Sequence, residues 1–232
     1  MITVFFIIVT LIFYLALKRR KNKPGSVNIG REEFSGIFIN KNYNKIFAVS
    51  VLALLFYGIA EAVIYTWTPT FFRLDKNLSA QFAGYTLTIF WLAVTMGRIL
   101  VSTILCRIKP YIMALCLSIL SLISLVLMIF AGRGFIIILA IVLVGLGYSG
   151  IFPLIFSTSS LIYPKGKSIL ETFLFVATSL GAALAPYLTG IGLRLNAKYS
   201  ASVAMIFMAL VALLIIINII NYKIFVKNQN VC

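Results

Sequence analysis

Long apolar runs alternate with short polar connections along the chain. A helix that crosses the roughly 30 Å hydrocarbon core of a membrane needs roughly 17 to 25 residues, and barrel strands would instead give alternating segments of about ten residues. The seven predicted spans are Ile2–Leu17, Ile46–Phe72, Phe82–Leu105, Tyr111–Phe130, Phe135–Ile162, Ile169–Gly190 and Ser200–Phe225. The pattern therefore predicts an all-α integral membrane protein with seven transmembrane helices.

Composition supports a membrane protein and argues against an enzyme. Of the 232 residues, 62% are apolar and 11% are charged, and the mean hydropathy is +1.10. Soluble domains are nearer to half apolar and a quarter charged. The chain holds no His and five acidic residues, which removes histidine bases, histidine metal ligands and most paired-carboxylate chemistry. We expect no enzymatic activity, no metal and no cofactor.

The basic residues predict the orientation of the spans. Fourteen of the twenty lie on the side that includes the loop 18–45: Lys18, Arg19, Arg20, Lys21, Lys23, Arg31, Lys41, Lys45, Arg107, Lys109, Lys165, Lys167, Lys223 and Lys227. Five lie on the other side: Arg73, Lys76, Arg133, Arg194 and Lys198. Cytoplasmic loops carry an excess of Lys and Arg, so we expect an inner (plasma) membrane protein with the N-terminus outside and the C-terminus in the cytoplasm. The alternative interpretation of the KRRKNK run is a patch for nucleic acid or anionic lipid, but topology explains it better and no nucleic-acid partner is predicted.

These charges also divide the chain into parts. Residues 1–17 are predicted as a transmembrane helix, 18–45 as a basic cytoplasmic loop, 46–226 as a six-helix membrane domain and 227–232 as a cytoplasmic tail. A signal peptide is the alternative for the first span. Signal peptides carry their positive charge before the apolar run, whereas here it follows the run, so we expect an uncleaved anchor.

Four of the spans have a polar or small face at helical spacing. The residues are Tyr57, Glu61, Tyr65 and Thr68 in the second span; Thr88, Trp91, Thr95, Arg98 and Ser102 in the third; Gly145, Ser149, Pro153 and Ser157 in the fifth; and Thr178, Ala182 and Pro186 in the sixth. Small residues and hydroxyls also mediate close helix packing without any transport role. The first, fourth and seventh spans are nearly all apolar and can be surrounded by lipid.

Glu61 is the most informative of these residues. A charge in the middle of a bilayer costs roughly 2.5 to 3.5 kcal/mol on insertion scales, and no structural need for one is evident. A water-filled path would explain it, so we expect Glu61 to line a pathway; the alternative is a satisfied buried acid. Tyr65 and Trp91 can stack on the apolar face of a sugar, although aromatic residues also anchor helices at the membrane surface.

Four segments of the chain resemble a known family. They are Tyr57–Thr70 (YGIAEAVIYTWTPT), Trp91–Leu100 (WLAVTMGRIL) with Arg107 after it, Gly150–Ser157 (GIFPLIFS) and Gly181–Gly190 (GAALAPYLTG). In this order they resemble helices seven, eight, ten and eleven in the C-terminal half of a major facilitator superfamily transporter, most closely the fucose permease-like sugar:proton symporters. The first span then resembles the sixth helix of the family.

The resemblance implies one half of a secondary active transporter for a sugar or similar small polar solute, with a proton as the candidate co-substrate. The predicted substrate pathway comprises Tyr57, Glu61, Tyr65, Thr68, Trp91, Ser149 and Pro153, and the predicted gate or brace comprises Arg98, Arg107 and Glu171. From their depths in the spans, we expect Arg98 not to pair directly with Glu61. Gly145 and Pro153 are expected to let the fifth span bend where a cavity forms.

The chain also departs from the family pattern. Cys106 stands before Arg107 where the family has an acid, and the first five helices are missing, together with the half that holds the family's proton-coupling carboxylate. A separate or lost N-terminal half is therefore expected. The alternative is a non-transporting membrane subunit or a transporter remnant. Substrate, coupling ion, direction and oligomeric state do not follow from the sequence.

Overall fold

The structure is a computed structural model. It describes residues 41–104, 108–132, 134–162, 167–195 and 197–229. The described residues form helices joined by short connections, with no strand among them. The all-helical prediction is therefore confirmed for this part of the chain.

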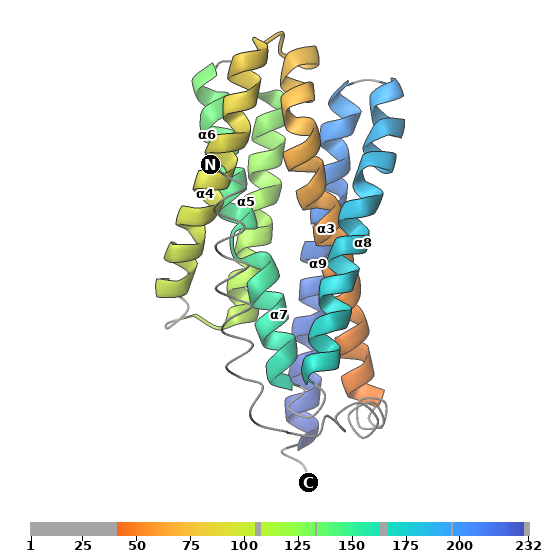
Figure 1. Cartoon of the computed structure of the whole chain (residues 1–232). Helices are drawn as coiled ribbons and strands as arrows, with labels where there is room; N and C mark the ends of the chain where they lie inside the picture. Colours follow the sequence, from red (N-terminus) through yellow and green to blue (C-terminus); the bar gives the residue numbers. More distant parts are fainter. Residues whose placement is uncertain (1–40, 105–107, 133, 163–166, 196, 230–232) are drawn as a thin grey trace, which may run out of the picture.

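Seven helices form the described bundle (Figure 1). They are α3 (Lys41–Asp75), α4 (Ala80–Ile104), α5 (Pro110–Phe130), α6 (Gly134–Tyr148), α7 (Ile151–Ile162), α8 (Lys167–Leu195) and α9 (Ala197–Gln229). Six stretches are long and apolar enough to cross a membrane, because α6 and α7 together make one. In such a stretch the backbone must satisfy its own hydrogen bonds, which is why these apolar runs are helical.

The last six predicted spans correspond to these six stretches. The first predicted span, Ile2–Leu17, lies outside the described residues. The total of seven spans therefore stays a prediction. Helix α3 begins at Lys41, so its first turn takes up the last residues of the predicted loop 18–45.

The predicted fifth span is not one continuous helix. It is interrupted at Ser149 and Gly150, between α6 and α7. The Ser149 N–H donates to the Leu146 carbonyl at 3.3 Å, which tightens the last turn of α6, and Pro153 has no N–H to offer to a preceding carbonyl. The backbone carbonyls at the end of α6 are thus left without regular helical partners.

Helix α3 is the centre of one side of the bundle and packs most extensively on α8 and α9. Two glycines bring the backbones of α3 and α8 together. A Cβ on Gly58 would collide with the Thr178 carbonyl, and a Cβ on Gly181 would collide with the Leu55 carbonyl. Such close approach through small residues is how membrane helices gain van der Waals contact without a hydrophobic driving force.

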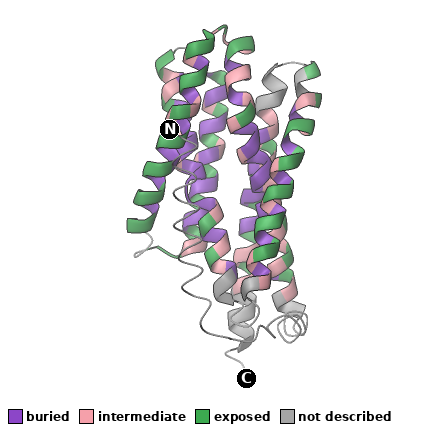
Figure 2. Cartoon of the chain, in the orientation of Figure 1, coloured by how far each residue is buried: buried purple, intermediate pink, exposed green. Residues whose placement is uncertain are grey.

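Burial differs sharply between helix faces (Figure 2). A continuous apolar core runs between the helices and includes large side chains that are almost fully enclosed, such as Leu54, Leu125, Met128 and Ile137. Long apolar side chains on α4 and α8 remain exposed, among them Leu92 at 61% and Phe175 at 62%. These outer faces have no protein partner within the described part of the chain.

Candidate functional site

Glu61 lies near the middle of α3, partly buried, with its carboxylate held by a neighbour on the same helix. The Tyr57 hydroxyl lies 2.8 Å from Oε1 of Glu61. Because residues four apart in a helix share a face, the spacing read from the sequence produces this contact directly. The acid therefore has a defined partner inside the membrane-spanning region.

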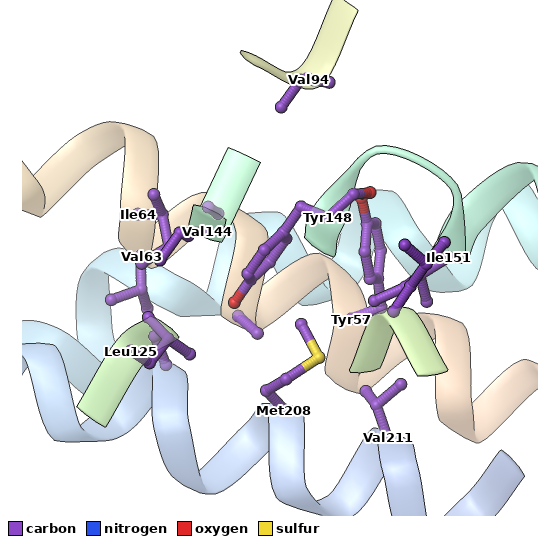
Figure 3. Close-up of a cluster of buried hydrophobic side chains, with 14 of the residues drawn as sticks. Tyr57, Val63, Ile64, Val94, Leu125, Val144, Tyr148, Ile151, Met208 and Val211 are labelled. Atoms are coloured by element: carbon purple, nitrogen blue, oxygen red, sulfur yellow. The ribbon is translucent and has the colours of Figure 1, made fainter. Parts of the chain in front are cut away.

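Tyr57 joins α3 to the break between α6 and α7. Its hydroxyl also lies 3.1 Å from the backbone carbonyl oxygen of Tyr148, the last residue of α6. The two tyrosine rings are 5.8 Å apart and both are enclosed by the apolar core (Figure 3). Glu61, Tyr57 and the Tyr148 carbonyl thus form one polar line across two elements that are far apart in sequence.

Aromatic rings extend from this line toward the exposed side of α3 and α4. Tyr65 and Trp91 face each other with ring centroids 6.0 Å apart, and Phe90 is 5.2 Å from Trp91. Trp91 is 41% exposed, whereas Phe90 is buried. A carboxylate that accepts hydroxyl hydrogen bonds beside an accessible aromatic ring has the chemistry that binds a small polyhydroxylated solute.

Arg98 is exposed on α4, on the side that carries Trp91. No ion pair within 4.0 Å joins Arg98 to Glu61, and Asp75 at the end of α3 is paired with Lys76. The Arg98 charge nevertheless acts electrostatically on Glu61. The structure thus places a positive charge near the carboxylate without a direct contact.

The other predicted site residues lie in different surroundings. Thr68 is buried beside a cavity of about 10 Å³ that Thr86 also lines. Ser149 is fully buried, and its hydroxyl donates to the Leu146 carbonyl at 2.6 Å. Neither hydroxyl reaches the exposed side of α3 and α4 in this conformation.

Three more predicted residues belong to the ends of the spans or to the helix break. Pro153 is exposed in the first turn of α7, and Glu171 is partly buried in the first turns of α8. Arg107 lies outside the described residues. The structure therefore brings together Tyr57, Glu61, Tyr65 and Trp91, with Arg98 nearby, and leaves the remaining residues apart from them.

Sequence reasoning missed the role of Tyr148. Tyr148 is assigned no role in the sequence analysis, whereas its backbone carbonyl is the second partner of the Tyr57 hydroxyl. The signal that points to this carbonyl is the Gly150 and Pro153 pair, which predicts a helix interruption just after Tyr148. Among the described residues, no three His, Cys, Asp or Glu side chains gather where a metal ion could bind.

Comparisons with known proteins agree with this arrangement at the level of fold. A variant of the E. coli fucose:proton symporter FucP superposes with a TM-score of 0.68 at 17% identity, over 80% of this chain and 45% of that protein. The structure of FucP in an outward conformation gives a TM-score of 0.66 at 17% identity, over 80% of this chain and 44% of that protein. The chain thus spans less than half the length of these solved transporters. Comparison with curated proteins gives no match.

The sequence itself matches a family model that covers most of its length. The match is to the Major Facilitator Superfamily and extends over residues 1–169. This superfamily consists of membrane transporters, in agreement with the six described stretches that are long and apolar enough to cross a membrane. The chain therefore belongs to the major facilitator superfamily.

Proposed function

We propose that this chain forms one half of a secondary active transporter that moves a sugar or similar small polar solute by alternating access. The observation that carries the proposal is the group formed by Glu61, Tyr65 and Trp91, which offers a hydrogen-bond acceptor beside two aromatic rings in mid-membrane. The structural relative FucP is a fucose:proton symporter, which supports a sugar and a proton as the first candidates. The buried Tyr57 hydroxyl positions the Glu61 carboxylate through their hydrogen bond.

The proposed half corresponds to the C-terminal six helices of the superfamily. The chain covers about 45% of the relatives' length, and the exposed apolar faces of α4 and α8 leave room for a second bundle. Binding cavities in this superfamily lie between two halves, near the midplane. The second half is supplied either by a separate chain or by the rest of a longer one.

Alternating access needs elements that change their packing. The interrupted α6 and α7, with Ser149 and Pro153 at the break, can bend because Pro removes a backbone hydrogen bond. Arg98, together with Arg107 and Glu171, is proposed as a gate or brace toward the cytoplasmic end. This assignment follows from their positions near the ends of the spans.

Uptake of radiolabelled sugars tests the proposal. Cells that carry the chain together with the N-terminal half of a fucose permease-like transporter are expected to accumulate sugar, and cells that carry either half alone are not. Membrane amounts of the chain, measured in parallel, show that insertion is equal. Background uptake in all three strains, with several candidate sugars, would favour the alternative of a non-transporting membrane subunit.

The same proposal includes an orientation, with the N-terminus outside and the C-terminus in the cytoplasm. It rests on the fourteen-to-five distribution of Lys and Arg between the two sides. In a variant without native cysteines, a cysteine at Asn28 in the basic loop is expected to resist an impermeant thiol reagent in intact cells. A cysteine at Asn77, between α3 and α4, is expected to react. The opposite labelling pattern would reverse the orientation.

A further inference from the structure

We propose that Glu61 is a proton-binding site and that the break between α6 and α7 responds to its proton through the Tyr57 hydroxyl. The inference rests on the proposed function, because it names a proton as a ligand of the same site. Its evidence is nevertheless separate. It comes from the hydrogen bonds that link Glu61, Tyr57 and the Tyr148 carbonyl.

The number of available hydrogens decides which form of Glu61 fits this geometry. The Tyr57 hydroxyl has one hydrogen but lies within hydrogen-bond distance of two acceptors, Oε1 of Glu61 at 2.8 Å and the Tyr148 carbonyl oxygen at 3.1 Å. If Glu61 is ionised, one of these two contacts has no hydrogen between its oxygens. If Glu61 is protonated, its O–H donates to the Tyr57 oxygen and the Tyr57 O–H donates to the carbonyl. The protonated form therefore satisfies both contacts.

The carbonyl at the end of this line is unusual because it belongs to the helix break. Tyr148 ends α6, and α7 begins at Ile151, so this oxygen lies where the helical ladder is interrupted. An unpartnered carbonyl inside a membrane protein is costly, and the Tyr57 hydroxyl relieves that cost. The hydrogen bond thus ties the break to α3.

Release of the proton changes this tie in a defined way. The Glu61 O–H bond breaks, the proton passes to water on the accessible side, and a carboxylate remains. The Tyr57 hydrogen then turns from the Tyr148 carbonyl toward the carboxylate. One proton lost from Glu61 therefore removes one hydrogen bond between α3 and the break, and rebinding restores it.

Among the described residues, the charged or titratable groups that interact electrostatically with Glu61 are Tyr57 and Tyr65 on α3, Tyr148 on α6 and Arg98 on α4. The contact between Gly58 and Thr178 fixes the height of α3 relative to α8. Measured along the helix axis from that contact, Glu171 of α8 lies about 15 Å from Glu61, and Tyr187 of α8 lies about 9 Å from it.

The remaining helices that pack on α3 are α7 and α9. The described side chains of α7 include no titratable group. On α9, Tyr222 contacts Tyr111 at the far end of the bundle, beyond the level of the bond between Asn218 and Ser50. The proton site is therefore shared by α3, α4 and α6.

Infrared spectroscopy of the full chain in lipid vesicles tests the proposal without any transport. A protonated carboxylic acid gives a C=O stretching band that carboxylates lack. We expect such a band in the wild-type protein, its loss as the pH is raised, and its absence in Glu61→Gln. Glu171→Gln is the matched control on another membrane helix and is expected to keep the band. A band that survives in Glu61→Gln, or no band at any pH, would overturn the site.

Two tyrosine variants test the tie to the helix break. Tyr57→Phe keeps the ring but removes the hydroxyl, so the Glu61 band is expected to shift in frequency. Tyr148→Phe removes a buried hydroxyl that has no hydrogen-bond partner among the described residues and keeps the backbone carbonyl, so the band is expected to stay in place. An unshifted band in Tyr57→Phe would overturn the link through Tyr57. Because no solute is present, these outcomes are independent of whether the chain transports sugar.

Discussion

Glu61→Gln is expected to reduce sugar uptake by the completed carrier at least about tenfold while membrane insertion stays unchanged. Glutamine keeps the shape of the side chain and can still contact the Tyr57 hydroxyl, but it cannot become a charged acceptor or release a proton. Hydrogen bonds to charged groups contribute roughly 1.5 to 3 kcal/mol, and each 1.4 kcal/mol is about tenfold. Initial rates of uptake, normalised to the amount of carrier in the membrane, measure the effect.

Asp75→Asn is the matched control for this variant. It removes a carboxylate from the same helix, but at the end of α3, where the partner is Lys76 at 3.1 Å. We expect uptake close to that of the wild type. Normal uptake by the Glu61→Gln carrier would show that Glu61 is a structural acid, and the pathway would then rest on Tyr65 and Trp91 alone.

Gly181→Ala is expected to destabilise the bundle by about 1 to 3 kcal/mol, the usual cost of overpacking. The added methyl group would overlap the Leu55 carbonyl, a backbone atom that cannot rotate away. Helices α3 and α8 must then separate, which loosens the element that carries Glu61. Denaturant unfolding of the chain in detergent, followed by tryptophan fluorescence, reports the loss.

Gly190→Ala provides a control on the same helix. A Cβ at Gly190 meets nothing within 4 Å, and alanine favours the helix over glycine by up to about 1 kcal/mol. This variant is expected to be as stable as the wild type or slightly more stable. Equal stability of the two alanine variants would contradict the close α3–α8 packing.

The helices themselves were predictable because a helix satisfies the backbone hydrogen bonds of a long apolar run inside a membrane, and few other structures can do so. The predicted span Tyr111–Phe130 differs by one residue from α5, which begins at Pro110. The predicted span Phe135–Ile162 was right in extent but wrong in continuity, because the chain breaks at Ser149 and Gly150. Hydropathy registers the length of an apolar run but does not register its backbone hydrogen bonds.

The site was predictable only where it depends on local spacing. Tyr57 and Glu61 were predicted to share a helical face, and in the structure their side chains form a hydrogen bond. The partnership of Tyr57 with the Tyr148 carbonyl joins residues 91 positions apart, so no periodicity along the chain indicates it. Ser149 fits the polar face of its span by spacing, yet the structure packs it against Gly97. Helical spacing gives the face of a residue but not its neighbour on another helix.

The face of α3 and α4 around Glu61 and Trp91 is proposed to line a water-filled pathway and not to face lipid. Thr95, exposed one turn from Trp91, and Ile123, 63% exposed on α5, provide matched positions. In a completed carrier without native cysteines, a charged, impermeant thiol reagent should label Thr95→Cys and leave Ile123→Cys unlabelled, because a thiol in hydrocarbon does not ionise. An excess of transported sugar should slow the labelling. Equal labelling of both cysteines, or of neither, would contradict the pathway.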